Sequence, residues 1–392
     1  MSPIRRHNDA TLRVGIAVDW LPAARPEIRE WPECFYAHLA EDAFEHGCVV
    51  YLFHLLSVDF RRGRVAGWIR TTSKGPWEKR QLPLPHVVYN RISRREVEAH
   101  PACRRILDRL KARMPLFNPR FLDKEEVQVA LARSPIAEHL PPAIVTRDPA
   151  EAVVYIEEFG AAFLKPVRGS LGNGVAYAER RGELFLVRVN PPLTAQDPAP
   201  LEKSWTRQQL RRALARRMRL EALIVQWAVP RCRWRGRPFD IRSLVQKDAG
   251  GRWRLTGAAG RVAAPAGLTT HSLRGGSRVP YHRLAGEADA ALPALAELES
   301  ICRRAAEEVE AACGGSFFEF SMDLAIAQDG RPYLLEVNAK PFPFDEERIR
   351  HLAAKRLFAY ARAQALDRGL TAARERRGIR SNKMAALDTP SR

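Results

Sequence analysis

The spacing of hydrophobic and polar positions changes several times along the chain, and each change predicts a new element. Apolar runs at 12–18 and 49–55 are typical of buried strands, and the amphipathic stretch 37–46 between them predicts a helix. Gly47 follows that helix in the position of a C-terminal glycine. The same patterns predict a Gly/Pro-rich hairpin, a strand and a helical segment at 63–76, 86–90 and 94–111. Residues 1–115 are therefore expected to form an N-terminal α/β domain.

A second section, residues 116–226, alternates helices and strands around a loop rich in glycine. Its most regular element is an amphipathic helix predicted over 204–220, with Ser204 as the N-cap. Arginines occupy the polar side of this helix, where they either contact an acidic substrate or lie in solvent. The other elements expected here are helices at 123–132 and 149–160 and strands at 143–146, 161–167, 174–180 and 184–189.

A third section, residues 227–345, combines strands with one long helix. The tail, residues 346–392, begins with a helical pattern and becomes polar, and we expect disorder from Lys383 onward. The elements predicted for the third section, with the strand that leads into it, are strands at 222–229, 239–246, 317–326 and 331–338 and a helix at 293–313.

The composition is that of a globular protein of two or three domains, with 392 residues, of which 46% are hydrophobic and 28% charged. No stretch approaches the about 18 uncharged apolar residues of a membrane span. The polar N-terminus lacks the apolar core of a signal peptide, so we expect a cytoplasmic protein that does not enter a membrane. The six cysteines form no Cys-x-x-Cys pair, which argues against a zinc ribbon or a disulfide framework.

The formal net charge of +19 favours an anionic partner. Nucleic acid, a nucleotide and an acidic polymer all fit such a charge, and so does a solvated arginine-rich surface. The sequence contains no recognised nucleic acid-binding motif, which argues against RNA or DNA.

The loop rich in glycine is the first candidate for chemistry, and Lys165 lies directly before it. Gly169, Ser170, Gly172 and Gly174 would let backbone N–H groups turn toward an anion, with the Lys165 charge beside it. No Gly-Lys-Ser/Thr follows, and a strand rather than a helix comes next, which excludes a P-loop and a Rossmann fingerprint. A phosphate-binding loop and an ordinary hairpin with a long turn both fit this pattern.

The second candidate is a pair of carboxylates on neighbouring strands. Asp329 and Gly330 form a hairpin-turn dipeptide, and a two-residue loop there would place Asp323 opposite Glu336. Asn338 shares the face of Glu336. Facing carboxylates repel one another unless a cation lies between them, and a set of oxygen ligands suits Mg²⁺. A solvated face with a salt bridge to arginine is the alternative, but the apolar neighbours favour the metal.

A third group of polar residues lies between these two. Asp240 and Arg242 share a face of the predicted strand 239–246, where Asp240 could accept ribose hydroxyls and Arg242 could meet an anion. Arg261 and the loop 269–276 add positive charge and backbone donors. Taken singly, each of these features is also typical of a surface charge or a turn.

In this order, the motifs resemble the ATP-grasp superfamily, and within it the YheC/YheD group of endospore coat-associated proteins. The Asp-Ile-Arg element at 240–242 and the Glu-Val-Asn element at 336–338 are also similar to RimK-type glutamate ligases. The resemblance spans about residues 86–345 and rests on the segments 88–92, 117–119, 122–124, 165–166, 169–174, 225–226, 239–248, 256–257, 275–276 and 335–341 and on Trp253 and Arg261.

The resemblance implies the ATP-grasp fold, in which an N-terminal α/β domain precedes two α+β lobes that hold ATP between them. Lys124 and Lys165 would contact the phosphates, and the loop from Gly169 to Gly174 would close over them. Gln226 and Trp227 would lie at the adenine, and Asp240 would bind the ribose. Many superfamily members have glutamate where this chain has Gln226.

The resemblance also implies a reaction. Asp323, Glu336 and Asn338 would hold Mg²⁺, and Arg242 and Arg261 would neutralise the transferring phosphoryl group or the acyl phosphate. We therefore expect an ADP-forming ligase that joins a carboxylate to an amine, on small molecules or peptides. The alternative is an ATP-binding structural protein that associates with spore-coat proteins and has no ligase turnover.

Overall fold

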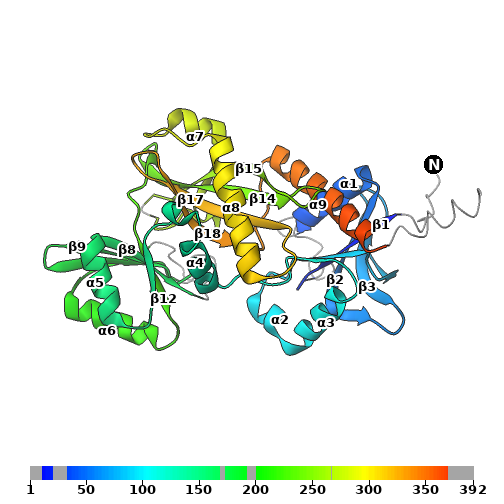
Figure 1. Ribbon diagram of the computed structural model, residues 1–392, viewed down its shortest axis with the longest axis horizontal. Coiled ribbons are helices and arrows are strands. Elements are labelled where there is room, and N and C mark those ends of the chain that lie inside the picture. The colour runs from blue at the N-terminus through cyan, green and yellow to red at the C-terminus, as the bar shows by residue number, and fades with distance from the viewer. Residues whose placement is uncertain (1–10, 21–32, 168–172, 192–199, 266, 370–392) are drawn as a thin grey trace, which may run out of the picture.

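The computed structural model describes residues 11–20, 33–167, 173–191, 200–265 and 267–369, and Figure 1 draws the other segments in grey. Three sheets follow one another along the long axis, with helices on their faces (Figure 1). The sheet formed last in the chain lies between the other two. We call the three the N-terminal, central and C-terminal sheets, in chain order.

The N-terminal sheet has the strand order β4-β3-β2-β1-β5-β6. β1 pairs in parallel with β2 and β5, and β5 pairs in parallel with β6. Strands β1 to β6 span Leu12–Ala17, Cys48–Asp59, Arg64–Arg70, Trp77–Pro83, Val87–Asn90 and Leu116–Phe117. Helices α1, α2 and α3 span Glu33–Glu45, Arg95–Ala99 and Pro101–Lys111. This mixed sheet with its helices confirms the predicted α/β class of this part.

Two elements of the N-terminal sheet differ from expectation. The segment 63–76, expected as one hairpin, contains the whole of β3, which pairs with β2 on one side and β4 on the other. The expected helix over 94–111 is divided into α2 and α3 at Pro101. Proline has no N–H and disfavours a helical backbone at the preceding residue. His100 accordingly has a ψ of 131° and caps α3 by accepting a hydrogen bond from the Ala102 N–H.

The central sheet has the strand order β11-β10-β9-β8-β12-β7, and α5 and α6 pack against it. Leu210, Leu214 and Met218 of α6 are buried against β8 and β12, as their spacing predicts. Strands β7 to β12 span Ala143–Thr146, Ala161–Pro166, Ala176–Arg181, Leu184–Val189, Leu201–Thr206 and Leu223–Trp227. Helices α5 and α6 span Pro149–Phe159 and Arg207–Met218.

The start of α6 corrects one prediction. Ser204 is not the N-cap, because residues 201–206 form the edge strand β11 beside β10. Thr206 caps the helix instead, and its hydroxyl accepts a hydrogen bond from the Gln209 N–H while the Gln209 side chain bonds back to the Thr206 N–H. This reciprocal capping box satisfies two helix-end donors at once, which the sequence at Ser204 does not offer.

The C-terminal sheet has the order β16-β15-β14-β17-β18, and β13 pairs with β14. α8 covers one face together with α4, whose Val127 and Leu131 belong to the same core. Strands β13 to β18 span Arg233–Trp234, Arg237–Lys247, Trp253–Val262, Ser277–Pro280, Glu319–Ile326 and Pro332–Asn338. Helices α4, α7 and α8 span Lys124–Ala132, Tyr281–Glu287 and Leu295–Cys313, and short 3-10 turns cover Ala137–His139 and Ser272–Arg274. The domain boundaries at 115, 226 and 345 stay predictions.

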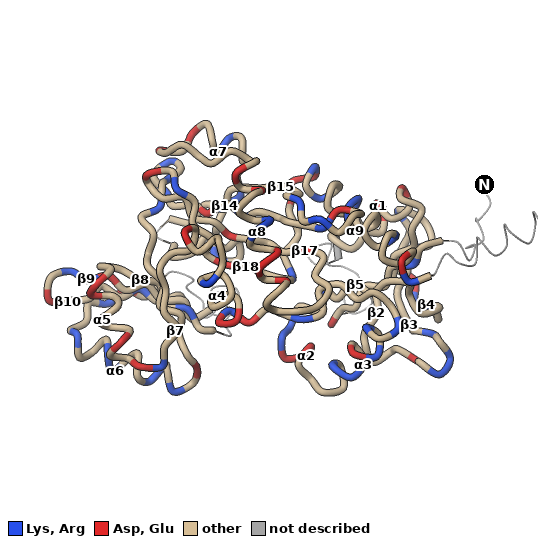
Figure 2. Tube along the Cα trace, viewed as in Figure 1, with Lys and Arg blue, Asp and Glu red and all other residues tan. Residues whose placement is uncertain are grey.

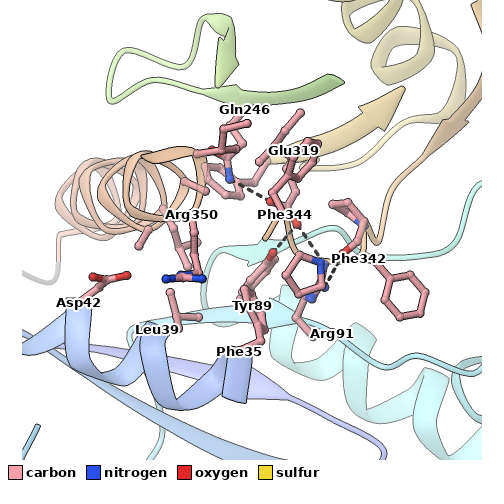
Figure 3. A pocket seen from close by; sticks show the side chains of 18 residues that line it. Phe35, Leu39, Asp42, Tyr89, Arg91, Gln246, Glu319, Phe342, Phe344 and Arg350 are labelled. Carbon is pink, nitrogen blue, oxygen red and sulfur yellow. Dashed lines mark hydrogen bonds and ion pairs between the residues drawn. The ribbon is translucent and has the colours of Figure 1, made fainter. Parts of the chain in front are cut away.

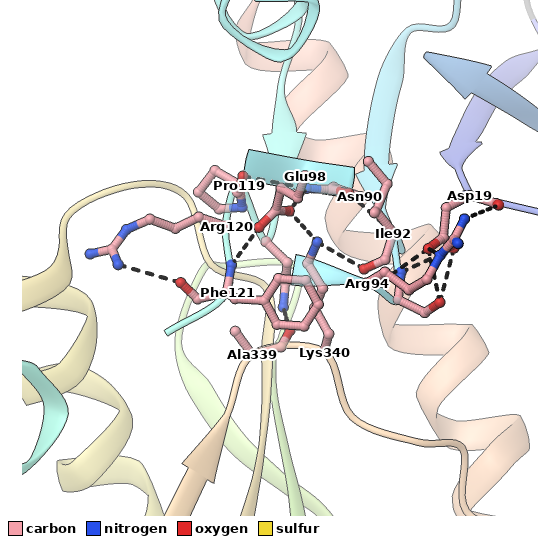
Figure 4. Close-up of polar contacts among 12 residues, drawn as sticks. Asp19, Asn90, Ile92, Arg94, Glu98, Pro119, Arg120, Phe121, Ala339 and Lys340 are labelled. Carbon is pink, nitrogen blue, oxygen red and sulfur yellow. Dashed lines mark hydrogen bonds and ion pairs between the residues drawn. The ribbon is translucent and has the colours of Figure 1, made fainter. Parts of the chain in front are cut away.

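Buried polar contacts join the N-terminal and C-terminal sheets (Figure 4). The Glu98 carboxylate accepts hydrogen bonds from Asn90 Nδ2 at 2.7 Å and from the Phe121 N–H at 2.8 Å. Lys340, just beyond β18, forms an ion pair with Glu98. Asn118 adds a second connection, since its Oδ1 accepts from the Phe318 N–H at 2.9 Å. The two sheets are therefore held together by polar groups of which Asn90, Glu98 and Asn118 are buried.

The tail returns to the N-terminal sheet as α9, Glu347–Asp367. Ala354, Leu357 and Phe358 are buried in one core with residues of β1 and β2, so the helical pattern of the tail is confirmed. Residues 370–392, including the stretch from Lys383 onward where we expect disorder, lie outside the described part of the chain.

Two observations concern the molecule as a whole. In the described ranges, no helix has the length and apolar character needed to cross a bilayer. Basic positions occur on all three parts of the chain rather than on one of them (Figure 2). Among described side chains, five cysteines are buried and free of disulfides: Cys48, Cys103, Cys232, Cys302 and Cys313.

The capping box gives a test of the fold. Thr206→Ala should lower the free energy of unfolding by about 1 kcal/mol, because it removes the side-chain acceptor of an N-terminal helix N–H. Ser204→Ala, on the exposed edge strand, should change it by less than about 0.5 kcal/mol. Urea unfolding followed by circular dichroism compares the two variants, and equal losses would contradict Thr206 as the cap.

Candidate functional site

The hairpin of β17 and β18 places two carboxylates side by side, as predicted, but by a different route. The turn is longer than two residues and spans Gln328 to Gly330, since the Ala327 N–H donates to the Arg331 carbonyl. This moves the register by one residue, and a β-bulge between Asp323 and Leu324 moves it back. Asp323 therefore faces Glu336 after all.

The rest of the predicted metal set lies on the same two strands. Asn338 pairs with Ser321, so it stands two residue pairs beyond Asp323 and Glu336 and on their face of the sheet. In the described ranges, no three His, Cys, Asp or Glu side chains lie together so as to hold a metal ion. The predicted set of Asp323, Glu336 and Asn338 contains only two residues of those types.

Each of the two carboxylates is held by a basic side chain. Arg242 of β14 forms a bidentate pair with Asp323, with N···O distances of 2.8 and 2.9 Å. Lys124, at the start of α4, lies 3.3 Å from Glu336. Burial disfavours the charged form of Asp323, but the Arg242 guanidinium outweighs burial and holds the pKa of Asp323 below its ordinary value. Each carboxylate is therefore paired with a basic side chain.

Lys165 of β8 brings the central sheet to this cluster. Its Nζ donates to Oε1 of Gln226, on the neighbouring strand β12, at 2.6 Å. Burial lowers the pKa of Lys165 to about 8, although the Glu336 carboxylate nearby acts in the opposite direction. The Gln226 side chain is a neutral amide, so it does not compensate the charge of the Lys165 ammonium as a glutamate at this position would. The Lys165 charge is therefore available to another anion.

Asp240 and Arg261 occupy the other side of the cluster. The two carboxylate oxygens of Asp240 accept from Arg231 Nη1 and Thr270 Oγ1, both at 2.8 Å. Arg261 lies 3.7 Å from Glu346 and stacks over the Phe344 ring at 5.3 Å from its centroid. Burial lowers the pKa of Arg261, and the neighbouring Arg242 charge adds to this effect. Both groups are thus buried and close to the carboxylate pair.

Sequence reasoning missed two members of this neighbourhood. Arg231 follows the end of β12 and Glu346 precedes α9, and neither stands in a recognisable motif. Each finds its partner, Asp240 or Arg261, through the tertiary fold. The position of Arg231 just after a predicted strand that leads to the site was the one available signal.

The loop rich in glycine is described only at its end. Gly169, Ser170 and Gly172 lie outside the described residues. Gly174 has a φ of 67°, a left-handed conformation that favours glycine, and its carbonyl accepts from Arg217. Asn173 Oδ1 accepts a hydrogen bond from Arg274 Nη2 at 2.9 Å, so the turn Ser272–Arg274 contacts the end of this loop.

Most of the predicted residues that are described meet in one cluster of charges. Trp227 lies beside it, where its ring packs edge-on against Tyr333 with centroids 5.8 Å apart. The basic members outnumber the acidic ones by five to four: Lys124, Lys165, Arg231, Arg242 and Arg261 against Asp240, Asp323, Glu336 and Glu346. A surplus of positive charge beside paired carboxylates suits a polyphosphate bound with a divalent cation.

The fold defines the class of protein. D-alanyl-alanine synthetase A from Vibrio cholerae O1 superposes with a TM-score of 0.52 at 12% identity, covering 93% of this chain and 99% of that one. The ATP-grasp ligase PsnB complexed with minimal precursor gives a TM-score of 0.51 at 16% identity, covering 89% of this chain and 99% of that one. The protein therefore has the ATP-grasp fold, as the sequence predicts.

The family follows from the sequence. The model of the YheC/D-like ATP-grasp family matches residues 113–363, more than half of the chain, and the protein belongs to this family. The endospore coat-associated protein YheD of Bacillus subtilis strain 168 is 24% identical over 376 residues, which are 90% of this chain and 80% of that protein. Both findings confirm the predicted family resemblance.

The Arg242–Asp323 pair gives a stability test. Arg242→Met would leave a mostly buried carboxylate without its cation, so the free energy of unfolding should fall by about 3 kcal/mol. Arg278→Met, which removes the cation of the exposed pair with Asp345, should cost less than about 1 kcal/mol.

Urea unfolding of both variants at pH 7 measures the difference. The double variant Arg242→Met, Asp323→Leu removes both charges and should regain most of the loss. If the double variant is as unstable as the single one, an unpaired Asp323 is not the cause.

Proposed function

We propose that this protein is an ATP-dependent, ADP-forming ligase that joins a carboxylate to an amine through an acyl phosphate. The observation that carries the proposal is the cluster in which Asp323 and Glu336 lie side by side beneath Arg242, Lys124 and Lys165. The ATP-grasp fold and the family membership support it. Both leave the acid and the amine open, because a fold does not define a substrate.

The nucleotide would occupy the side of the cluster formed by the central sheet. Lys124 and Lys165 would bind its phosphates, and the loop from Gly169 to Gly174 would cover them. In the structure, Lys165 is bound to a neutral amide, so a phosphate oxygen would offer it a stronger, charge-assisted hydrogen bond. Lys124, whose Nζ lies 3.3 Å from the Glu336 carboxylate, would place a second cation beside the phosphates.

The base and sugar would lie against the residues next to these lysines. Gln226 and Trp227 would lie beside the adenine, where the Gln226 amide can both donate and accept. Asp240 would accept the ribose hydroxyls, for which each of its carboxylate oxygens keeps a second lone pair beyond the bonds to Arg231 and Thr270.

The donor set fits Mg²⁺. Asp323, Glu336 and Asn338 offer oxygen ligands only, and the bidentate arginine uses one lone pair on each Asp323 oxygen, which leaves others free. Mg²⁺ bound there would neutralise phosphate charge and polarise the transferred phosphoryl group. Arg242 would keep Asp323 ionised and oriented whether or not the ion is bound.

Arg242 and Arg261 would stabilise charge during transfer. A substrate carboxylate oxygen bonds to the γ-phosphorus while the bond to the ADP oxygen breaks; an amine nitrogen then bonds to the acyl carbon while phosphate leaves and the amine loses a proton. Fixed cations placed where this charge develops lower the barrier without reorganisation. Both guanidinium groups are mostly buried, with side-chain exposures of 16% and 7%, so water screens them weakly.

Glu336→Gln tests the reaction class. Loss of the carboxylate should reduce ADP and phosphate release from Mg-ATP by at least about 100-fold, because the charge facing Asp323 is gone. Glu138→Gln, the same change at a side chain that is 64% exposed, is the matched control. The assay supplies pooled amino acids, short peptides and acidic peptide polymers, and full activity in Glu336→Gln would contradict the assignment.

The name of the Bacillus subtilis relative supports a second proposal, an ATP-binding spore-coat component without ligase turnover. A thermal shift with Mg-ATP but no product on any pool would favour it.

Lys165 predicts a pH dependence. Since burial lowers its pKa to about 8, the side chain is charged below that pH and neutral above it. Nucleotide affinity should therefore fall by about tenfold between pH 7 and pH 9 as the ammonium loses its proton. Lys165→Arg keeps its charge over this range and should flatten the profile. Isothermal titration with a non-hydrolysable ATP analogue measures both, and equal pH dependence in the variant would contradict the role of Lys165.

A further inference from the structure

A narrow cavity lies between the N-terminal sheet, the C-terminal sheet and α9, apart from the charge cluster (Figure 3). Helix α1 and strand β5 form one wall, α9 forms another, and β14, the start of β17 and the segment 341–344 close the remainder. Most of its lining is apolar, with Leu39, Leu244, Phe318, Ile349, Ala353 and Leu357 among the side chains that face it.

At one end of the cavity, the polar groups around Glu319 are hydrogen-bonded to one another. Glu319 accepts hydrogen bonds from Tyr89, from Arg91 Nη1 at 3.1 Å and from Gln246 Nε2 at 2.9 Å. The second nitrogen of the Arg91 fork, Nη2, donates to the Pro341 carbonyl at 2.6 Å. A ligand would gain little by replacing these bonds, so this end acts as a neutral floor.

At the other polar end, two buried atoms lack hydrogen-bond partners among the described residues. Asp42 is 4% exposed, and its Oδ1 lies 2.8 Å from His351 Nδ1. Its Oδ2 is buried and has no hydrogen-bond partner among the described residues, and the same holds for Nε of Arg350. Figure 3 shows the Asp42 carboxylate and the Arg350 guanidinium pointing toward one another at the edge of the cavity. A buried acceptor and a buried donor of this kind are costly unless something pairs with them.

The cavity shares a wall with the charge cluster. In the segment 341–344, Phe342 packs perpendicular to His271, with ring centroids 6.2 Å apart, and Phe344 lies under the Arg261 guanidinium. Both Phe342 and Phe344 also line the cavity. A molecule that fills the cavity therefore lies one side chain away from the groups that would stabilise the transferred phosphoryl group.

We propose that this cavity binds an apolar side chain of a peptide substrate, with the adjoining peptide group between Asp42 Oδ2 and Arg350 Nε. This proposal rests on the proposed ligase function and names its substrate class. A peptide group carries one donor and one acceptor, which are the complements of the two unpaired atoms. The apolar walls take the side chain, and the neutral floor at Glu319 completes the pocket.

Charged ligands fit less well. A carboxylate would be attracted by Arg350 but repelled by Asp42. An ammonium group would be attracted by Asp42 but repelled by Arg350. Either charge would also lose its water against mostly apolar walls, which costs more than the single ion pair returns. A neutral amide with an aliphatic or aromatic side chain satisfies both polar atoms and the walls together.

The test uses direct binding, so that it does not depend on turnover. The probes are N-acetyl-leucinamide, N-acetyl-phenylalaninamide and N-acetyl-glycinamide, titrated into the full chain by ligand-observed NMR. The two apolar probes should bind at least tenfold more tightly than the glycine probe. Ala353→Leu fills the cavity from α9 and should weaken the apolar probes at least tenfold. Ala359→Leu makes the same change on the exposed side of α9 and should leave binding unchanged.

A second readout separates this proposal from the ligase proposal. Affinity for the ATP analogue, measured in parallel, should be the same in both variants, because the cavity lies apart from the lysines. Equal binding of all three probes, or equal loss in Ala353→Leu and Ala359→Leu, would overturn the pocket assignment. Probe binding without any ADP release would sustain the pocket and count against the ligase.

Discussion

Two carboxylates face one another across β17 and β18, and the surrounding structure must supply positive charge to compensate them. Asp323 and Glu336 are partly buried, and each carboxylate would destabilise the hairpin without a cation beside it. The cations come from separate parts of the chain, since Arg242 belongs to β14 and Lys124 starts α4. Lys165 approaches from the central sheet. The site is therefore also an electrostatic link between the C-terminal and central sheets.

The same face of the C-terminal sheet serves two purposes along its length. Near one end, Asp323 and Arg242 contribute to the charge cluster; further along the paired strands, Gln246 and Glu319 meet Tyr89 and Arg91 of the N-terminal sheet. The opposite face is apolar and covered by α8. Period-two alternation in two strands thus yields a packed core on one side and, on the other, both the candidate site and the contact with the N-terminal sheet. This explains why the last sheet in the chain lies in the middle of the molecule (Figure 1).

Local patterns predicted the strands and helices well where the hydrophobic periodicity determines which side of the element is buried. β10 matches its expected range of 184–189, and the burial of Leu210, Leu214 and Met218 follows their helical spacing. The failures were also local: Thr206 rather than Ser204 caps α6, because an edge strand continues through Ser204. The pairing of Asp323 with Glu336 was right although the expected turn was too short, since the bulge restored the register.

The amino-acid sequence was enough to identify the ATP-grasp class and the alternation that places Asp323 and Glu336 on one face. Its motifs also named ten candidate side chains within the described residues. Which charges meet depends on the tertiary structure. Three ion pairs join segments whose local sequence does not indicate the partner. They are Arg231 with Asp240, Arg261 with Glu346 and Asp42 with His351. The cavity between α1, β14 and α9 arises in the same way. Periodicity encodes which side of an element is buried, whereas the identity of the neighbour depends on how whole elements pack.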